Sequence, residues 1–346
     1  MNFLITNREI ITQNRKETLR EDGKEYAGDN IRFGEYDLGS KAFTLYQEPE
    51  TLTDLAYDNL PESEAKLKGS HKFFRKLHHE IMQAKVQNPQ KADVLFFVHG
   101  FKTNVEGVKD AYKDLHEKYV LPAESPIAHI VMFSFPSQSP WGTVPVPFYT
   151  YYDDKKDAIR SGEALARVFE KLKRFFTFFF IERDGYKKNK LCGQQIHLMV
   201  HSMGNQVVGA MMEKINAQTT EIFGEIILVA ADIDYNAFEK EGAYNRLIDM
   251  GKRIHIYHSR QDHILDFSKF TKNLNNRLGK YGRNHIDNAL HDVHDIDVSR
   301  CDDDAQYQKL VNKFGGHWYY YTSSEVANDI INVLKGEKSN ILPKSN

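Results

Sequence analysis

The 346-residue sequence predicts one doubly wound α/β domain, a mostly parallel sheet with helices on both faces. Short, continuous apolar runs recur from about residue 90 to residue 336, as expected of parallel strands buried on both faces. Amphipathic helical patterns alternate with these runs. The composition, 41% hydrophobic and 27% charged, is that of a globular protein, and the chain is long enough to bury a large core.

The chain divides into three predicted segments. Residues 1–60 contain short β-like runs between polar turns and are predicted to form an N-terminal β extension. Residues 61–336 are predicted to form the α/β domain, and residues 337–346 a polar tail. The domain opens with a helix whose apolar stripe has three- and four-residue spacing, formed by Phe73, Phe74, Leu77 and Ile81.

Strands and helices alternate through the rest of the domain. Predicted strands occupy 94–98, 130–135, 196–200, 226–231 and 254–257. Helical stripes lie between them at 105–115, 164–179 and 207–215. A last helix is predicted to start near Thr322, which forms a capping box with Glu325, and to run through Val333.

Charge and composition exclude several functions. Lys and Arg total 46 and Asp and Glu 48, a net charge of −2, and no basic block is long enough to serve as a nucleic-acid arm. No secretory signal pattern occurs at the N-terminus, and the segment most like a membrane span, residues 174–183, has an apolar run far shorter than the ~20 residues required. Two cysteines suit a reducing compartment. We therefore expect a cytoplasmic protein that has no transmembrane segment and does not bind nucleic acid.

The strongest motif follows the strand at 196–200. There Ser202 stands between a strand and a helix, in the sequence HSMGN, so it is expected on a sharp turn that exposes its hydroxyl. Gly204 suits such a turn, whereas Val200 replaces the first glycine of the pattern G-x-S-x-G. The N–H of Met203, at the start of the helix, faces a developing oxyanion. The alternative is an ordinary helix-capping serine.

A second oxyanion donor is predicted after the strand at 94–98. The sequence His99-Gly100-Phe101 stands where hydrolases of this design place their other backbone donor, so the Phe101 amide is expected to act with that of Met203. Gly100 lets the backbone approach a substrate. His99 is expected to be structural.

A serine nucleophile needs a base, and the base needs a carboxylate that orients it. Asp262 lies in the loop after the strand at 254–257, and His317 follows two glycines shortly before the last helix. The chain order Ser202, Asp262, His317 is that of the α/β-hydrolase fold.

Together the motifs resemble the DUF900 family of bacterial α/β-hydrolases. The resemblance rests, in chain order, on Thr6-Asn7-Arg8, residues 33–35, His99-Gly100-Phe101, residues 133–137, 201–205, 231–234 and 316–319. It implies a serine esterase-like or lipase-like fold with Ser202 as nucleophile and His317 as base. We therefore expect an enzyme that hydrolyses a small-molecule or acyl ester through an acyl-enzyme, without a cofactor or metal. The substrate and the oligomeric state stay open.

Alternatives remain for the acid and for the chemistry. Asp232 and Asp234 follow the strand at 226–231 and compete with Asp262 for the role of triad acid. Three histidines mixed with aspartates, His285, His291 and His294, suggest a metal-assisted hydrolase instead, with His291 and His294 as ligands. A third hypothesis is a binding protein that keeps the fold without turnover.

An aromatic segment, residues 140–152, follows the strand at 130–135. Its three prolines and its glycine exclude a regular helix in its first half, so an ordered loop near the mouth of the site is expected. Trp141, Phe148 and Tyr149 are candidates for a substrate-pocket wall. The alternative is that these rings seal the core.

Overall fold

The computed structural model describes the chain in twelve stretches: 1–13, 16–21, 28, 30–47, 67–101, 103–137, 147–176, 194–215, 221–266, 275–284, 290–301 and 316–341. For 147–152 and 176 the description covers the backbone alone.

The described strands are β1 (Asn2–Thr6), β2 (Ile10–Gln13), β3 (Lys16–Leu19), β4 (Arg32–Asp37), β5 (Ala42–Leu45), β6 (Asp93–Val98), β7 (Ile127–Ser134), β8 (Ile196–His201), β9 (Phe223–Val229), β10 (Gly251–His258) and β11 (Val293–Asp297). The described α-helices are α1 (Gly69–Gln87), α2 (Val105–Leu115), α3 (Pro147–Phe176), α4 (Gly204–Lys214), α6 (Leu278–Tyr281), α8 (Tyr319–Thr322) and α9 (Ser324–Leu334). A π-helical turn, His116–Val120, extends α2, and a short 3₁₀ turn, Leu247–Met250, precedes β10.

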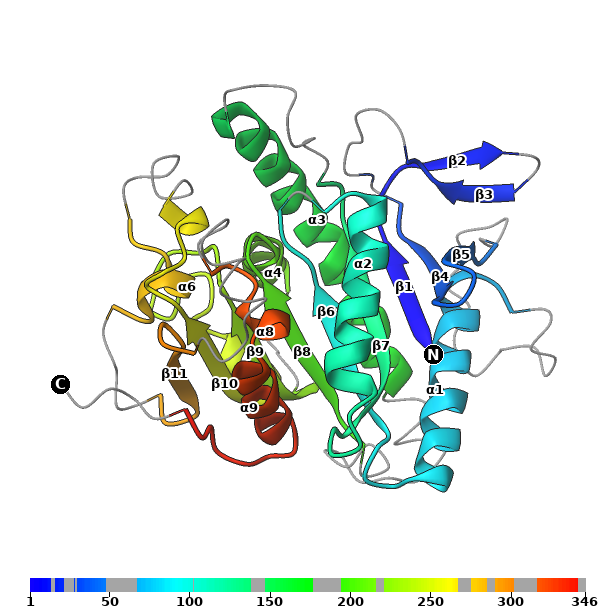
Figure 1. Cartoon of the computed structure of the whole chain (residues 1–346). Helices are drawn as coiled ribbons and strands as arrows, with labels where there is room; N and C mark the ends of the chain where they lie inside the picture. The colour runs from blue at the N-terminus through cyan, green and yellow to red at the C-terminus, as the bar shows by residue number, and fades with distance from the viewer. Residues whose placement is uncertain are drawn as a thin grey trace.

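Nine of the described strands form one twisted sheet in the order β11-β10-β9-β8-β6-β7-β1-β4-β5 (Figure 1). The seven strands from β11 to β1 are parallel, and β4 and β5 complete the sheet with antiparallel pairing. The strand order reverses direction around β6, β7 and β8. Ligands of open α/β sheets bind at the carboxyl edge near such a reversal, so this topology directs attention to the loops after β6 and β8.

The strands of the N-terminal segment contribute to this sheet. β1 lies between β7 and β4, with Phe3 opposite Val131 on one side and Glu35 on the other. β2 and β3 form a separate hairpin beside the sheet (Figure 1). The carboxyl end of β1 therefore reaches the same edge as the carboxyl ends of β6 and β8.

The five strands predicted for the α/β domain are all present, but their bounds differ and one strand of this domain, β11, was not predicted. β9 begins at Phe223 and not at 226, because the buried Glu225, which interrupts the apolar run, binds Arg253 and His255 on the neighbouring strand. Ladder hydrogen bonds use the backbone, so a neutralised polar side chain does not end a strand. Residues 293–297, for which the sequence predicts no strand, form the edge strand β11.

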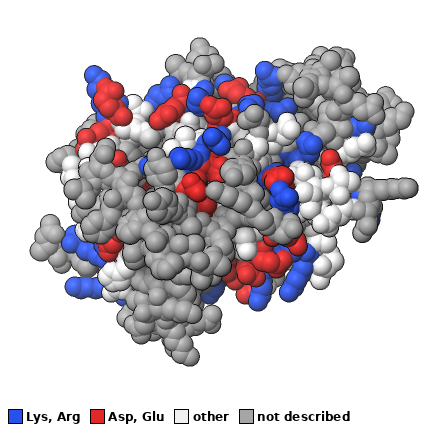
Figure 2. All heavy atoms as spheres, turned by 90° about the horizontal axis from the view of Figure 1, so that it is seen from above, with Lys and Arg blue, Asp and Glu red and all other residues white. Residues whose placement is uncertain are grey.

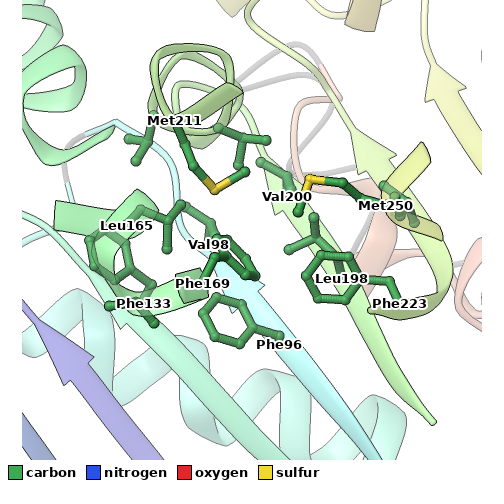
Figure 3. Packing of buried hydrophobic residues seen from close by; sticks show 14 of the residues in the cluster. Phe96, Val98, Phe133, Leu165, Phe169, Leu198, Val200, Met211, Phe223 and Met250 are labelled. Atoms are coloured by element: carbon green, nitrogen blue, oxygen red, sulfur yellow. The ribbon is translucent and has the colours of Figure 1, made fainter. Parts of the chain in front are cut away.

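Alternate residues of each central strand enter two hydrophobic layers. Val94, Phe96 and Val98 face the layer beneath α1, α3 and α4, where Phe169 and Met211 pack against them (Figure 3). The intervening residues of β6 face the other layer, which contains α2 and α9. Burial on both faces confirms the predicted parallel sheet between two layers of helices.

The helical stripes are confirmed where the structure describes them. Phe73, Phe74, Leu77 and Ile81 are all buried along α1. The predicted capping box at the last helix is off by one residue, because the α9 N-cap is Ser323, whose hydroxyl accepts from the Val326 N–H at 3.3 Å. Thr322 ends α8 instead and donates its hydroxyl to Trp318 O at 2.9 Å.

Charges of both signs are interspersed over the described residues of the surface seen from above (Figure 2). This mixture agrees with the net charge of −2. Within the described stretches, no helix combines the length and apolarity that crossing a bilayer requires.

Phe73→Ala is expected to lower the free energy of unfolding by about 3–5 kcal/mol. The buried ring of Phe73 lies 5.4 Å from that of Phe3 and 5.2 Å from that of Phe33, so it joins α1 to β1 and β4. Urea unfolding followed by circular dichroism measures the change. The control is Val86→Ala at an 83% exposed position of the same helix, which is expected to stay within about 0.5 kcal/mol. A loss below 1 kcal/mol for Phe73→Ala would contradict this packing.

Candidate active site

Ser202 lies on a strained turn between β8 and α4. Its φ is +50°, a left-handed conformation that residues other than glycine rarely adopt. The Ser202 N–H donates to Val229 O, and the Asp232 N–H donates to Ser202 O, both at 3.1 Å. These two bonds hold the turn against the end of β9. Strain retained in this way is typical of functional positions.

Buried hydrogen bonds of Asn205 and Tyr244 support the turn from the α4 side. The Asn205 side-chain amide donates to Ser202 O at 3.0 Å and to Val200 O at 3.3 Å. The hydroxyl of Tyr244, from the segment after β9, donates to the Asn205 side-chain oxygen at 3.0 Å. Val200 itself is fully buried in the core, so a large apolar side chain is accommodated where the general pattern has glycine.

Two glycines allow the end of β6 to touch this turn. A Cβ at Gly100 would lie 2.8 Å from Ser202 Cβ and 2.9 Å from the His201 ring. A Cβ at Gly204 would lie 2.6 Å from His99 O and 2.9 Å from Val98 O. These separations are shorter than real contacts, so only glycine fits either position. The Gly100 backbone thus lies beside Ser202, as the sequence motif predicts.

Asp262 and His317 meet across 55 residues of sequence. His317 Nδ1 lies 2.6 Å from Asp262 Oδ2, and both side chains are buried. The other carboxylate oxygen of Asp262 accepts from the N–H groups of Ile264 and Leu265, at 3.1 and 3.2 Å. Asp262 is therefore held by its own loop, and an imidazole bound through Nδ1 keeps Nε2 available for chemistry.

The His317 ring packs directly beside the serine turn. Its centroid lies 4.8 Å from that of His201, the residue before Ser202, and His201 Nε2 lies 3.4 Å from His317 O. Burial, and then the neighbouring His317, lower the pKa of His201 well below its ordinary value, so His201 is neutral at pH 7. Among the described residues no hydrogen bond joins Ser202 Oγ to the imidazole, and such bonds are often loose before substrate binds.

The two alternative acids bind other partners. Asp232 accepts from the Gln206 amide at 2.9 Å and lies 3.4 Å from the buried Arg277 guanidinium. Asp234 pairs with the same guanidinium through a second nitrogen. The structure thus places Asp262, and neither of these two carboxylates, against the His317 ring.

Sequence reasoning missed Lys280, which lies on α6 and supports the loop that contains Asp262. Its ammonium donates to Asp262 O at 3.1 Å and binds Asp266 Oδ2 at 2.6 Å. A lysine carries no motif of its own, and it reaches the loop only because α6 packs against the end of β9. A Cβ at Gly279 would lie 2.0 Å from Ala231 N, so a glycine is required for this packing. The sequence signal for this contact was the glycine that precedes Lys280, and that signal is weak.

The metal hypothesis gains no support from the described residues. His294 lies on the edge strand β11, where its ring stacks on His255 at 5.2 Å, and His291 is exposed just before that strand. The described stretches contain no group of three or more metal-binding side chains. His285 lies outside the described residues.

The structure describes only part of the predicted pocket wall. Trp141 lies outside the described residues, and Phe148 and Tyr149 fall at the start of α3, where the backbone alone is described. The ordered loop predicted for residues 140–152 is wrong for residues 147–152, which form the start of α3 because proline is tolerated at the first position of a helix. Residues 140–146 lie outside the described residues. A cavity of about 570 Å³ lies beside α4, lined by residues that include Gln206, Glu213 and most of residues 233–243.

A nine-stranded, mostly parallel sheet in the described chain, with a serine at the sharp turn after β8, defines an α/β-hydrolase fold. The chain belongs to the DUF900 family, described as alpha/beta hydrolases of unknown function, which residues 75–310 match. Both the predicted fold class and the resemblance are therefore confirmed.

Comparison with other known proteins gives little information about the function of the chain. No curated protein matches the chain. Among solved structures, the chain is similar to the acylaminoacyl peptidase of Pyrococcus horikoshii, with 12% identity and a TM-score of 0.31. The match covers 98% of this chain and 58% of the peptidase, so the chain spans less than two thirds of that protein's length.

Gly204→Ala is expected to lower the free energy of unfolding by about 1–3 kcal/mol, because the added methyl group forces two backbone carbonyls of β6 away from α4. Thermal or urea unfolding measures the effect. The matched control is Gly107→Ala within α2, where the new Cβ meets nothing closer than 3.4 Å, and alanine there is expected to be neutral or stabilising by up to about 1 kcal/mol. Equal stability of the two variants would contradict the close approach.

Proposed function

We propose that this protein is a serine hydrolase of carboxylic esters, with Ser202 as nucleophile, His317 as general base and Asp262 as the orienting acid. The observation that carries the proposal is the 2.6 Å contact between His317 and Asp262, at the sheet edge where Ser202 occupies its strained turn. Membership of an α/β-hydrolase family supports it.

In the proposed reaction Ser202 Oγ attacks the ester carbonyl carbon while its proton passes to His317 Nε2. Asp262 holds the proton on Nδ1 and stabilises the imidazolium that forms. The tetrahedral intermediate collapses, the alcohol leaves with the proton from His317, and an acyl-enzyme remains. Water, deprotonated by the same histidine, then releases the acid. Nucleophile, base and acid all come from the chain, so we propose that no cofactor takes part.

Two backbone N–H groups are proposed to stabilise the developing oxyanion. Met203 stands at the N-terminus of α4, where helix N–H groups point outward along the positive end of the dipole. Phe101 follows Gly100, whose backbone lies against Ser202. Donors in this arrangement face the negative charge on the former carbonyl oxygen.

Ser202→Ala is expected to reduce the hydrolysis of p-nitrophenyl acetate by 10³-fold or more, because the acyl-enzyme cannot form. Wild-type protein is expected to be labelled by a fluorophosphonate probe at Ser202, as read by intact-mass spectrometry. Turnover is expected to persist in EDTA.

The two alternative functions, a metal-assisted hydrolase and a binding protein, predict different results in these experiments. Unchanged turnover in Ser202→Ala with loss of activity in EDTA would indicate metal-assisted hydrolysis. A folded wild-type protein with neither turnover nor labelling of Ser202 would indicate a binding protein that keeps the hydrolase fold.

Asp262→Asn is expected to lower kcat by roughly 10⁴-fold, because an amide facing Nδ1 selects the wrong imidazole tautomer. Asp234→Asn is the matched control, since its carboxylate pairs with Arg277 and does not contact His317. It is expected to keep kcat within severalfold. Steady-state kinetics on one p-nitrophenyl ester compares the two variants. A larger loss for Asp234→Asn, or for Asp232→Asn, would transfer the role of acid to that residue.

A further inference from the structure

Arg8 is a buried cation at the carboxyl end of β1, outside the proposed triad. Only 2% of the residue is exposed. Thr6 and Ser134 end the paired strands β1 and β7 opposite each other, and the Thr6 hydroxyl donates to Ser134 O at 2.7 Å. The same hydroxyl accepts from the Arg8 N–H at 3.0 Å. The guanidinium is thereby directed along the sheet edge toward the loop that follows β6.

One series of hydrogen bonds leads from Arg8 to Gly100 O through side chains. Arg8 Nε donates to Ser134 Oγ at 2.8 Å, so the serine proton is left for His99 Nε2, 3.3 Å away. The Phe135 N–H also points at His99 Nε2, at 3.1 Å. A backbone N–H can only donate, so Nε2 is the acceptor and Nδ1 carries the ring proton. Nδ1 then donates to Gly100 O at 2.9 Å.

A second series ends at the same atom. A terminal nitrogen of Arg8 donates to Thr103 O in a short contact. The Thr103 hydroxyl donates to Gly100 O at 3.1 Å. The guanidinium thus binds the Thr103 carbonyl, while the side chains of Thr103 and His99 both donate to the Gly100 carbonyl.

The orientation of that carbonyl determines the orientation of a proposed oxyanion donor. Gly100 C=O and the Phe101 N–H belong to one peptide group, and no cis peptide bond occurs among the described residues. In a planar trans peptide the two groups point in opposite directions. These hydrogen bonds restrict a peptide that follows glycine, the residue with the widest range of backbone angles.

We propose that Arg8 is a positioning residue that locks the Gly100–Phe101 peptide, through Ser134, His99 and Thr103, so that the Phe101 N–H faces the substrate carbonyl oxygen. The inference rests on the proposed serine hydrolase function and deepens it. It makes the N-terminal strand, which lies before the matched family region 75–310, part of the catalytic apparatus.

The electrostatics of His99 agree with this role. Burial, and then the Arg8 charge, lower its pKa to about 3, so the ring stays neutral at pH 7 and keeps one acceptor nitrogen. The ring also stacks on Phe135 at 4.3 Å with an interplanar angle of 8°, which fixes its plane.

Arg8→Met tests the proposal, because methionine keeps apolar bulk and removes every donor of the guanidinium. For p-nitrophenyl acetate we expect kcat to fall about 10²-fold or more, the effect of losing one oxyanion donor, with KM changed less than threefold. The inhibition constant of 1,1,1-trifluoro-2-butanone, which forms an oxyanion on addition of the serine, is expected to rise by a similar factor. The control, Arg20→Met, removes an arginine paired with Glu9 and is expected to keep wild-type kinetics.

Thr103→Val is a milder variant that removes only the hydroxyl bound to Gly100 O. We expect a twofold to tenfold lower kcat, in line with the loss of one hydrogen bond of about 0.5–1.5 kcal/mol. It decides the question if Arg8→Met does not fold, because valine is nearly isosteric with threonine. Arg8→Lys, which keeps the charge and a single donor group, is expected to fall between Arg8→Met and wild type.

The outcomes separate the inference from the proposed function. Ser202-dependent turnover in wild type, with wild-type kcat and ketone inhibition in folded Arg8→Met or in Thr103→Val, would overturn the positioning role and leave the serine hydrolase intact. A lower melting temperature with unchanged kcat would also overturn it, since that is the result of a purely structural role. Absence of Ser202-dependent turnover in wild type would overturn both.

Discussion

The structure depends on a backbone contact between the ends of two neighbouring parallel strands. Gly100 after β6 and Gly204 after β8 bring peptide groups closer than any Cβ would permit. This approach places the Gly100–Phe101 peptide beside Ser202 and the first turn of α4 against His99 O. The price is a left-handed φ at Ser202, which is retained because hydrogen bonds from Asn205 and to Val229 O hold the turn.

Around this contact, several buried carboxylates have charged or hydrogen-bonding partners. Glu225 meets Arg253 and His255 within the sheet, Asp232 meets Gln206 and Arg277, and Asp262 meets His317. An unpaired charge at any of these positions would cost several kcal/mol. The same requirement distinguishes the three candidate acids, because Asp232 and Asp234 both adjoin Arg277 while Asp262 adjoins the imidazole.

The sequence predicts those parts of the site that depend on short local motifs. Ser202, Gly204 and the His99-Gly100-Phe101 motif follow apolar runs directly, and the topology of parallel strands brings such loops to one edge. The support from Arg8, Ser134 and Lys280 was not predictable, because each acts across the fold on a loop that is distant in sequence. The strand β11 was missed for a related reason, since an edge strand needs no continuous apolar run and Val293–Asp297 alternates with polar residues.

The sequence by itself determined the fold class, the family, the order of the central strands and their helices, and the proposed nucleophile and base, because these depend on periodicity and short motifs. Tertiary structure decided which carboxylate faces His317, where β1 enters the sheet and which side chains hold the loop proposed to form the oxyanion hole. Those outcomes depend on distances between segments as much as 128 residues apart. No local pattern encodes such distances, because they arise only when the two hydrophobic layers close on the sheet and bring the strand ends together.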